Sequence, residues 1–456
     1  MGDDGVRRRC LFGTDGVRDV ANRGAMTPEM ALRLGRAYVL FLTERGVPRP
    51  RIVVGRDTRK SGPMLQSALV AGMTSAGADV LCVGVMPTPA VSYGVEALNA
   101  QGGAVISASH NPAEYNGIKF LDGAGCKLSD QDELAIEEYL GDNLIDDWRP
   151  SGASVGSIQY MESDFNNQYA SHVTSVGEKC DRDLRILFDC AHGAAASVIP
   201  EILRSCGFER ASILGASPDG LNINEKCGVM VMDTLCSAVR SEGYRLGIAY
   251  DGDADRVLLS DSQGRVLDGD IMLWVLARWL HSQGRLGEGV VATVMSNLAL
   301  ERRLQDESIS VYRCSVGDRY VLQTMKERGA HLGGEQSGHV IVHPFTKTGD
   351  GLCTGFLFLQ ACRDLGEDVD SLVDRFGRFP QKLTNIPVQN RASVMSSERI
   401  SQVVEAEDRA LGSSGRIFLR PSGTEPLIRL LVECEDSLRM ETLSRDLEQL
   451  ILETAL

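Results

Sequence analysis

The chain has 456 residues, of which 43% are apolar and 24% charged, and its formal net charge is −15. This is the composition of a folded globular protein, and the length predicts three or four domains because a single core stops growing at about 250 to 300 residues. The acidic balance argues against a nucleic-acid-binding protein, which would need a basic face.

The sequence offers no segment typical of membrane insertion. No apolar run approaches the roughly 18 to 20 residues that span a bilayer, and residues 1–10 carry basic side chains with no apolar stretch behind them. The 12 cysteines are scattered without a C-x-x-C pair, and Cys82, Cys190 and Cys434 lie in apolar runs. These features predict a cytoplasmic protein with buried, reduced thiols and with neither a membrane nor a nucleic-acid partner.

Apolar runs and helix-like segments alternate from the N-terminus, and the alternation begins again twice. The first series predicts a helix between Pro28 and Gly46, a strand at 51–55, a helix at 63–76 and strands at 79–85 and 104–106. The second predicts strands at 184–188 and 246–250 around a helix at 196–205. The third predicts strands at 290–294 and 309–312, helices at 298–305 and 318–328, and then Gly333-Gly334. Each series places a polar loop after an inner strand, which indicates three repeats of one α/β architecture.

The last part of the chain differs from these series. Its periodicity predicts a helix at 394–411, strands at 415–419 and 427–434, and a terminal helix at 438–454. The sequence therefore predicts an α/β fold with three similar mixed α/β domains and a C-terminal α+β domain. The expected domains are 1–155, 156–253, 254–371 and 372–456.

The segment from Asp251 to Arg256 places Asp251, Asp253 and Asp255 at alternate positions, directly after the apolar run 246–250. Three carboxylates so close repel one another unless a cation neutralises them, and Mg²⁺ prefers oxygen ligands. Alternate side chains share a face of an extended chain, so the three can converge if the segment curls. The segment predicts a divalent-cation site, with a solvated acidic turn as the simpler interpretation.

Two other acidic motifs can be compared with this segment. An EF-hand loop needs Gly at its sixth and Glu at its twelfth position, where this chain has Arg256 and Ser262, so that motif is excluded. An aspartate nucleophile of haloacid-dehalogenase-like phosphatases sits at the very end of a strand. Here the apolar run stops at Tyr250, two residues too early for Asp253, which disfavours that motif.

Three further loops carry polar groups. In the loop from Ser107 to Pro112, Ser109 can project its hydroxyl into a cleft, although Ser and Asn also favour ordinary turns. His110 is a weak candidate for activating Ser109, because adjacent side chains of an extended chain point apart and Ser109 does not stand in a G-x-S-x-G motif.

The loop at 333–339 concentrates hydrogen-bonding side chains that suit a polyol, and its other interpretation is a glycine-rich hairpin turn. The loop at 420–426, with Arg429 behind it, combines a guanidinium, hydroxyls and a glycine as a phosphate cradle does, although a surface loop can also hold an arginine. Walker A and G-x-G-x-x-G motifs are absent from the sequence, which argues against a nucleotide-binding phosphate loop.

Together and in this order, the loops resemble those of the α-D-phosphohexomutase superfamily along essentially the whole chain. The matching segments are 107–112 as the phosphoserine loop, 251–256 as the metal loop, 334–338 as the sugar loop and 420–424 as the phosphate loop. The segments 12–18, 55–59 and 316–320, and Gln336 in the sugar loop, are most similar to the bacterial phosphoglucosamine mutase branch.

The resemblance implies four domains around a central cleft and an enzyme, an intramolecular phosphotransferase of the isomerase class. The implied reaction interconverts glucosamine 6-phosphate and glucosamine 1-phosphate, on the way to UDP-N-acetylglucosamine and peptidoglycan precursors. A phosphoserine at Ser109 donates its phosphoryl group and a hexosamine 1,6-bisphosphate is the intermediate. The implied ligands of Mg²⁺ are Asp251, Asp253, Asp255 and an oxygen on Ser109.

The resemblance also assigns roles to other side chains. Arg18 and Arg256 face the moving phosphoryl group, while Lys119 and His339 are the proton-transfer candidates. The substrate-binding residues are Glu335, Gln336 and Ser337 for the sugar and Arg420, Ser422, Gly423, Thr424 and Arg429 for the distal phosphate. The expected partner is a small phosphosugar, and a homodimer is possible. The alternatives are a phosphomannomutase/phosphoglucomutase, a phosphosugar phosphatase and a silent phosphosugar-binding protein.

Overall fold

The computed structural model describes residues 11–455 except 14, 142–143, 178–179 and 423–425. These residues form two compact units. One takes in Met1–Val294 and Val311–Leu372, and the other Met295–Ser310 and Val373–Leu456. None of the described helices is long and apolar enough to cross a membrane. The 11 described cysteines are free thiols, and all but Cys314 are buried, as the sequence predicts.

The first unit contains three sheets that share one core topology. Along the chain, each sheet has three parallel strands followed by a fourth strand that runs antiparallel to the third. Across the sheet, these four strands lie side by side in the order fourth, third, first, second. The four strands are β2 (Arg51–Arg56), β3 (Asp79–Val85), β4 (Gly102–Ile106) and β5 (Tyr115–Leu121) in the first sheet; β7 (Ile186–Asp189), β8 (Ser212–Leu214), β9 (Leu246–Tyr250) and β10 (Val257–Asp261) in the second; and β12 (Val290–Thr293), β13 (Val311–Cys314), β14 (Leu332–Gly334) and β15 (Val340–Val342) in the third. This confirms the predicted repeats.

Short strands extend two of these sheets. β1 (Val17–Val20) pairs with β5 and β6 (Ile158–Tyr160) with β3, while β11 (Val266–Leu267) pairs with β10. The hairpin of β9 and β10 keeps residues 257–267 in the second sheet. The expected division after residue 253 therefore falls inside this hairpin, in the loop that carries the three aspartates.

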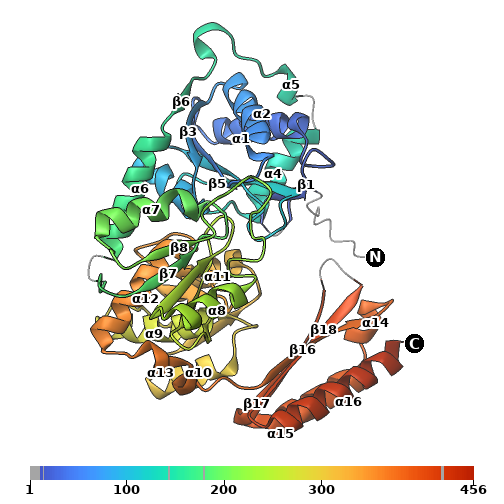
Figure 1. Cartoon of the computed structure of the whole chain (residues 1–456). Coiled ribbons are helices and arrows are strands. Elements are labelled where there is room, and N and C mark those ends of the chain that lie inside the picture. The colour runs from blue at the N-terminus through green and yellow to red at the C-terminus, as the bar shows by residue number, and fades with distance from the viewer. Residues whose placement is uncertain (1–10, 14, 142–143, 178–179, 423–425, 456) are drawn as a thin grey trace. The chain divides into compact units, whose positions relative to one another are not determined.

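Helices connect the strands of the repeats and cover the sheets (Figure 1). The helices of the first part of the chain are α1 (Pro28–Glu44), α2 (Gly62–Ser75), α3 (Thr88–Ala97), α4 (Asp130–Gly141), α5 (Leu144–Asp147), α6 (Glu162–Val176), α7 (Ala195–Cys206) and α8 (Met232–Glu242). Those that follow are α9 (Gly269–Ser282), α10 (Leu298–Asp306), α11 (Asp318–Arg328), α12 (Gly351–Leu365) and α13 (Val369–Phe376).

The packing of α1 against α2 shows how the sequence fixes the first core. Thr27 caps α1 by accepting a hydrogen bond from the N–H of Met30, and Pro28 follows in the first turn. The two helices approach so closely that a Cβ at Gly72 would lie 2.1 Å from the carbonyl oxygen of Leu32. Glycine is required there, and the contact seals one face of the first sheet, where Ile52 and other alternate strand residues are buried.

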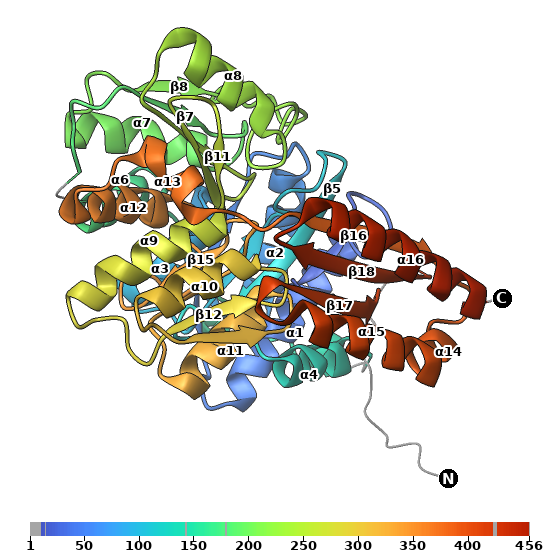
Figure 2. The ribbon, with the colours of Figure 1, turned by 90° about the horizontal axis from the view of Figure 1, so that it is seen from below.

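The second unit holds a three-stranded antiparallel sheet in the order β16 (Gln381–Pro387), β18 (Leu427–Cys434), β17 (Gly415–Pro421). Two long helices, α15 (Glu398–Leu411) and α16 (Ser437–Ala455), pack on it, and a short helix, α14 (Arg391–Met395), precedes them (Figure 2). Alternate residues of β18, including Ile428, Leu430 and Val432, are buried with the apolar side chains of the two long helices. Three mixed α/β sheets and a smaller C-terminal sheet domain confirm the predicted fold class.

Some expected elements differ from those observed. The prediction of a single helix at 394–411 is wrong, because Ser396 and Ser397 separate two helices. The Ser397 side chain caps α15 by accepting a hydrogen bond from the N–H of Ile400. The strand expected at 309–312 begins at Val311, because Ser308 has a positive φ of 59° and ends the preceding helix. Elements such as β16, α6 and α12 had no sequence prediction.

Candidate active site

The predicted functional loops of the first unit occupy one position in the shared topology. Each joins the third strand of a sheet to the fourth: Ser109 lies between β4 and β5, the three aspartates between β9 and β10, and Glu335 between β14 and β15. In α/β folds, the loops after the carboxyl ends of the strands are the usual place for ligands. The side chains of these loops meet one another in the structure, as the following contacts show.

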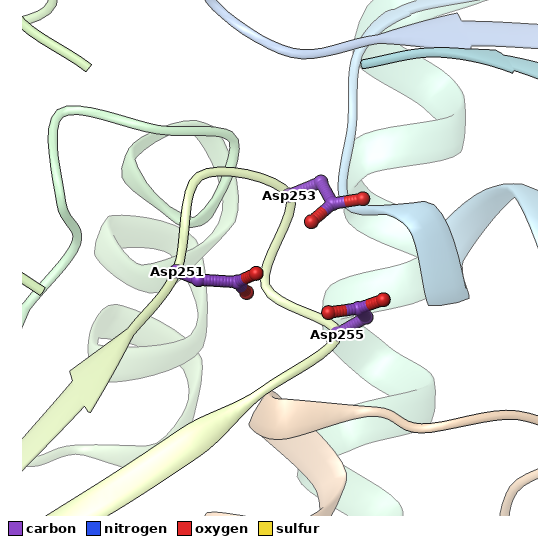
Figure 3. Close-up of side chains that lie close together, drawn as sticks. All are labelled: Asp251, Asp253 and Asp255. Carbon is purple, nitrogen blue, oxygen red and sulfur yellow. The ribbon is translucent and has the colours of Figure 1, made fainter. Parts of the chain in front are cut away.

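The three aspartates form a compact acidic cluster (Figure 3). Asp251, Asp253 and Asp255 each offer a carboxylate oxygen within 4.8 Å of the others, and at most 4% of each residue is exposed. The segment curls as predicted, with Ala254 at a positive φ of 55°. The interpretation as a solvated turn is therefore wrong.

The electrostatics of this cluster favour a cation. Burial, reinforced by Asp255 and Asp253, raises the pKa of Asp251 well above its ordinary value. Within the described part of the chain, neither Asp253 Oδ1 nor Asp255 Oδ1 has a hydrogen-bond partner, although both atoms are buried. Buried carboxylate oxygens without partners are costly unless a cation binds them, so the cluster fits a hard divalent metal.

The hydroxyl of Ser109 points at this cluster. It donates a 2.6 Å hydrogen bond to Asp251 Oδ2, and Ser109 is 2% exposed. Ser109 has a positive φ of 49°, an uncommon conformation for a residue other than glycine, so the chain here is not extended. As a result the His110 ring does approach its neighbour, with Nδ1 3.4 Å from Ser109 Oγ. The expectation that these adjacent side chains point apart was wrong.

His110 is nevertheless a neutral neighbour. Burial, together with the positive charges of Arg256 and Arg18, lowers the pKa of His110 to about 4. The imidazole therefore carries no charge at neutral pH.

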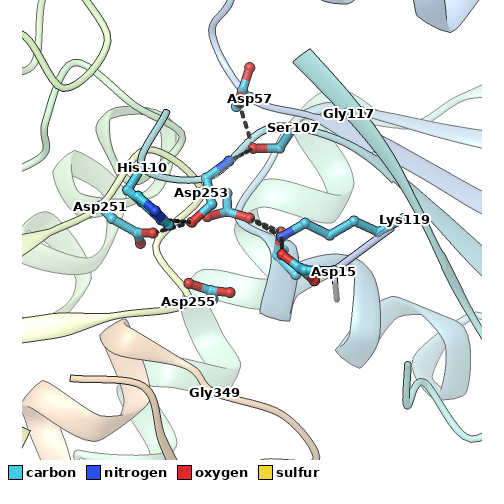
Figure 4. A network of polar contacts seen from close by, with 12 residues as sticks. Asp15, Asp57, Ser107, His110, Gly117, Lys119, Asp251, Asp253, Asp255 and Gly349 are labelled. Atoms are coloured by element: carbon cyan, nitrogen blue, oxygen red, sulfur yellow. Dashed lines mark hydrogen bonds and ion pairs between the residues drawn. The ribbon is translucent and has the colours of Figure 1, made fainter. Parts of the chain in front are cut away.

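A buried ion pair holds the backbone of the serine loop. Arg59 and Asp57 are fully buried, with Arg59 Nε 2.9 Å from Asp57 Oδ2. Arg59 also donates to the carbonyl oxygens of Ser109 at 3.0 Å and Asn111 at 2.7 Å. Asp57 accepts from Ser107 Oγ at 2.6 Å, and that oxygen accepts from the N–H of Ser109 at 2.9 Å (Figure 4). The pair thus fixes Ser109 on both sides of its Cα atom.

Replacing Arg59 with methionine should therefore destabilise the protein strongly. The change leaves Asp57 buried without its cation, which costs about 3 to 5 kcal/mol in comparable cases. The free energy of unfolding, measured by urea denaturation, should fall by that amount. The matched change Lys382→Met breaks an exposed ion pair with Glu441 and should cost less than about 1 kcal/mol. Equal losses in the two variants would contradict the anchoring role of Arg59.

Lys119 is a buried cation beside the metal loop. Its Nζ lies 2.9 Å from Asp253 Oδ2 and 2.9 Å from Asp15 Oδ2, and the residue is 1% exposed (Figure 4). Burial alone lowers a lysine pKa, but Asp15 and Asp253 outweigh it and raise the pKa of Lys119. Thr88 also donates to Asp253 Oδ2, at 2.6 Å. Lys119 is thus a charged donor held by two carboxylates.

Two arginines lie near the cluster. The N–H of Arg256 donates to Asp251 Oδ1 at 3.2 Å, and its guanidinium Nε is 4.0 Å from Asp255 Oδ1. Arg18, on β1, forms an ion pair with Asp15. Burial works against the charge of Arg256, but Asp255 and Asp251 raise its pKa. The acidic cluster is therefore accompanied by local positive charge in a protein that is acidic overall.

His339 contacts the third aspartate of the cluster. Its Nδ1 is 3.6 Å from Asp255 Oδ2, and its Nε2 accepts a 3.1 Å hydrogen bond from the N–H of Gly349. Burial opposes protonation, but Asp255 and Asp318 raise the pKa of His339. A Cβ at Gly349 would lie 2.4 to 2.5 Å from three atoms of the imidazole ring, so glycine is needed there.

Replacing Gly349 with alanine should consequently displace the His339 ring. If His339 takes part in turnover, kcat should fall about 10- to 100-fold, as displacements near 1 Å can cause. The matched change is Gly141→Ala, for which no described atom lies within 4 Å of the added Cβ. Steady-state kinetics of both variants check the prediction, and unchanged kcat in Gly349→Ala would contradict it.

The sugar-loop residues form a short hairpin turn. Glu335 Oε1 accepts a 3.0 Å hydrogen bond from the N–H of Gly317, and Ser337 Oγ lies 3.4 Å from Glu335 Oε2. The backbone oxygen of Gln336 accepts from the N–H of Gly269. The loop is thus both a glycine-rich hairpin and an ordered set of donors and acceptors.

The phosphate-loop residues belong to the second unit. Arg420 on β17 pairs directly with Arg429 on β18, and burial together with Arg429 lowers the pKa of Arg420. Two guanidinium groups at one cross-strand position repel each other, so the site suits an anion. Ser422 is buried, and Arg391 donates to its carbonyl oxygen. Gly423 and Thr424 lie outside the described residues.

Several contact residues of this site had no assigned role in the sequence. Asp15, Arg59 and Asp318 lie within segments that resemble the family. Their position in those segments was the feature of the sequence that could have indicated a role in the site. No feature of the sequence indicated a role for Thr88 or Lys127, because their contacts join residues that are far apart in the sequence.

Comparison with known proteins shows the family of the chain. Models of the four phosphoglucomutase/phosphomannomutase domains match the chain in order: α/β/α domain I at residues 9–144, domain II at 167–264, domain III at 268–379 and the C-terminal domain at 383–450. Proteins named phosphoglucosamine mutase are similar over most of their length. That of Carboxydothermus hydrogenoformans is 47% identical over 94% of this chain and 96% of its own. The chain belongs to the phosphoglucomutase/phosphomannomutase family.

Other members of the phosphoglucomutase/phosphomannomutase family show the same relationship. The phosphoglucosamine mutase of Pelotomaculum thermopropionicum is 46% identical over 93% of this chain and 94% of its own. A family protein of Burkholderia thailandensis has a solved structure with a TM-score of 0.81 and 22% identity, covering 98% of both chains. That likeness concerns the fold. Membership of the family implies a metal, and among the described residues the acidic cluster fits one.

Proposed function

We propose that this protein is a phosphoglucosamine mutase that interconverts glucosamine 6-phosphate and glucosamine 1-phosphate. The name of its relatives supports the substrate, and the contact between Ser109 and Asp251 supports the mechanism. A buried hydroxyl against three carboxylates is an unfavourable place for charge unless a cation is present. It becomes a favourable place for a phosphoryl group once Asp251, Asp253 and Asp255 hold Mg²⁺.

The proposed cycle begins with a phosphoryl group on Ser109. The substrate hydroxyl at C1 attacks phosphorus and gives up its proton, a sugar O–P bond forms, the Ser109 Oγ–P bond breaks, and Ser109 Oγ takes up a proton. The product is a 1,6-bisphosphate. After this intermediate turns round, Ser109 Oγ attacks the 6-phosphoryl group and gives up its proton, the O6–P bond breaks, O6 takes up a proton, and glucosamine 1-phosphate remains. When bound, Mg²⁺ neutralises charge on the transferred group.

The residues around the cluster fit the two kinds of task in this cycle. Phosphoryl transfer needs positioning and compensation of charge, which Arg18 and Arg256 can supply beside the metal loop. Lys119 and His339 are the groups that we assign to proton transfer, because each contacts a different carboxylate of the cluster. Each transfer removes one proton and supplies another, and both groups lie beside the metal loop where this takes place.

The remaining assignments concern substrate binding. Glu335 and Ser337 would bind sugar hydroxyls, with Gln336 between them distinguishing this loop from that of related mutases. Arg420, Ser422, Gly423, Thr424 and Arg429 would bind the phosphate that is not reacting. A grip on the distal phosphate allows either orientation of the bisphosphate to be held.

A panel of substrates tests the proposed function. Protein phosphorylated at Ser109 is mixed with Mg²⁺ and with the 6-phosphates of glucosamine, glucose or mannose, and products are followed by ³¹P NMR. We expect glucosamine 1-phosphate, with kcat/KM at least about 10-fold above the other sugars. Efficient turnover of glucose or mannose phosphates without glucosamine 1-phosphate would instead identify a phosphomannomutase/phosphoglucomutase. Stoichiometric release of inorganic phosphate would identify a phosphatase.

A further inference from the structure

Lys127 is a partly exposed lysine outside the loops that carry the proposed chemistry. It lies between β5 and α4, and 11% of its side chain is exposed. Its Nζ is 2.5 Å from Asp15 Oδ1 and forms a second ion pair with Asp318, the first residue of α11. Lys127 thus joins the N-terminal segment before the first sheet to a helix that packs on the third.

One side of this bridge leads to the metal loop through Lys119. Asp15 contacts Lys127 with one carboxylate oxygen and Lys119 with the other, at 2.9 Å from Oδ2 to Nζ. Lys119 in turn lies 2.9 Å from Asp253 Oδ2. Each cation on this side therefore lies between two carboxylates.

The other side leads to the same loop through His339. Asp318 Oδ2, which pairs with Lys127, is 3.8 Å from His339 Nε2, and His339 Nδ1 is 3.6 Å from Asp255 Oδ2. The series of contacts thus begins at Asp253 and ends at Asp255. It encloses the two groups to which proton transfer is assigned.

In such a series of ion pairs, the electrostatic free energy holds the charged side chains at fixed positions. A buried charge that loses its partner is costly, so the two lysines are held where the carboxylates on either side of each can reach them. Asp318 is also well placed at the start of α11, where a carboxylate interacts favourably with the helix dipole. Lys127 remains a cation, because Asp15 and Asp318 raise its pKa against the effect of burial.

We propose that Lys127 and Asp318 are positioning residues, whose ion pair keeps Lys119 and His339 in place on the two sides of the metal loop. The inference rests on the proposed mutase function, in which both ends of one bisphosphate must react. Each of the two successive transfers then needs a proton-transfer group held beside the metal loop. Neither Lys127 nor Asp318 is assigned a contact with the reacting atoms.

Kinetics of variants that remove either charge test the proposal. For Lys127→Met and Asp318→Asn we expect kcat to fall about 10- to 100-fold while KM stays within about 2-fold, because binding is kept and alignment is lost. Lys127→Arg should recover most of the lost activity. The double variant should lose much less than the product of the two single losses, since both changes break the same ion pair.

Lys326 supplies the matched control. It lines the same cavity of about 550 Å³ as Lys127 and Asp318, and Lys326→Met should keep wild-type kinetics. Wild-type kcat in Asp318→Asn and Lys127→Met, a loss confined to KM, or an equal loss in Lys326→Met would each overturn the proposal. If Lys127→Met does not fold, Asp318→Asn, which keeps the size of the side chain, decides the question. Absence of mutase activity in the wild-type protein would instead refute the proposed function.

Discussion

Replacing Ser109 with alanine is expected to lower mutase turnover by roughly 10⁴- to 10⁶-fold, as removal of a nucleophile does in other enzymes that use one. The physical reason is specific to this position. The Ser109 hydroxyl is buried, donates to Asp251 and is held by backbone contacts on both sides, and it is the oxygen that carries the phosphoryl group in the proposed cycle. Formation of glucosamine 1-phosphate, followed by ³¹P NMR, measures the loss.

Two comparisons make this result interpretable. Ser67→Ala removes an exposed hydroxyl on α2 and should leave turnover unchanged. The Ser109→Ala protein should still bind a divalent cation, measured with Mn²⁺ by electron paramagnetic resonance, because all three aspartates remain. Substantial turnover in Ser109→Ala would contradict a phosphoserine mechanism.

The second large effect is expected from Asp251→Asn. This change keeps the shape of the side chain but removes one of the three negative charges that would hold the metal. Turnover should fall by at least about 10³-fold, comparable to the loss of one electrostatic group at other active sites. Mn²⁺ affinity should fall as well. Asp306→Asn, which alters an exposed carboxylate on α10, should change neither quantity.

The same variant should have the opposite effect on stability. The folded-state pKa of Asp251 is raised by burial and by Asp255 and Asp253, so ionised Asp251 destabilises the metal-free fold. A carboxyl group with a raised folded-state pKa binds more protons when folded, and its destabilising effect therefore grows as the pH rises above its unfolded-state pKa.

Metal-free Asp251→Asn should accordingly have a higher Tm than metal-free wild type at neutral pH. This gain should shrink as the pH is lowered and Asp251 of the wild type becomes protonated. Adding Mg²⁺ should raise the Tm of the wild type much more than that of the variant. Thermal unfolding with and without Mg²⁺, at several pH values, measures all three effects. A lower Tm of the metal-free variant at neutral pH would show that Asp251 stabilises the fold.

The sequence predicted the elements whose signals are local. The strand ending at Tyr250 and the cluster that follows it were both apparent, because a dense apolar run and three alternating aspartates lie within ten residues. The helix at 318–328 was predicted at its observed bounds. By contrast, β16 was missed because its burial alternates weakly and most of its residues are only partly covered.

The parts of the site that escaped prediction depend on distant contacts. Lys127 and Thr88 gain their partners only when strands and helices far apart in the sequence are assembled. The approach of His110 to Ser109 follows from the left-handed backbone conformation of Ser109. A serine in the sequence does not indicate that conformation. The spacing of the three aspartates was enough to predict the acidic cluster. The contacts around the cluster could be identified only from the folded structure.

The most direct test of the proposed mechanism follows the phosphoryl group itself. Protein labelled with ³²P on Ser109 is mixed with Mg²⁺ and excess glucosamine 6-phosphate, and the label is traced over a single turnover. The label should leave the protein and appear in glucosamine phosphates, in an amount close to that of the labelled protein. Label that stays on Ser109, or that appears as inorganic phosphate, would contradict phosphoryl transfer from this serine to the sugar.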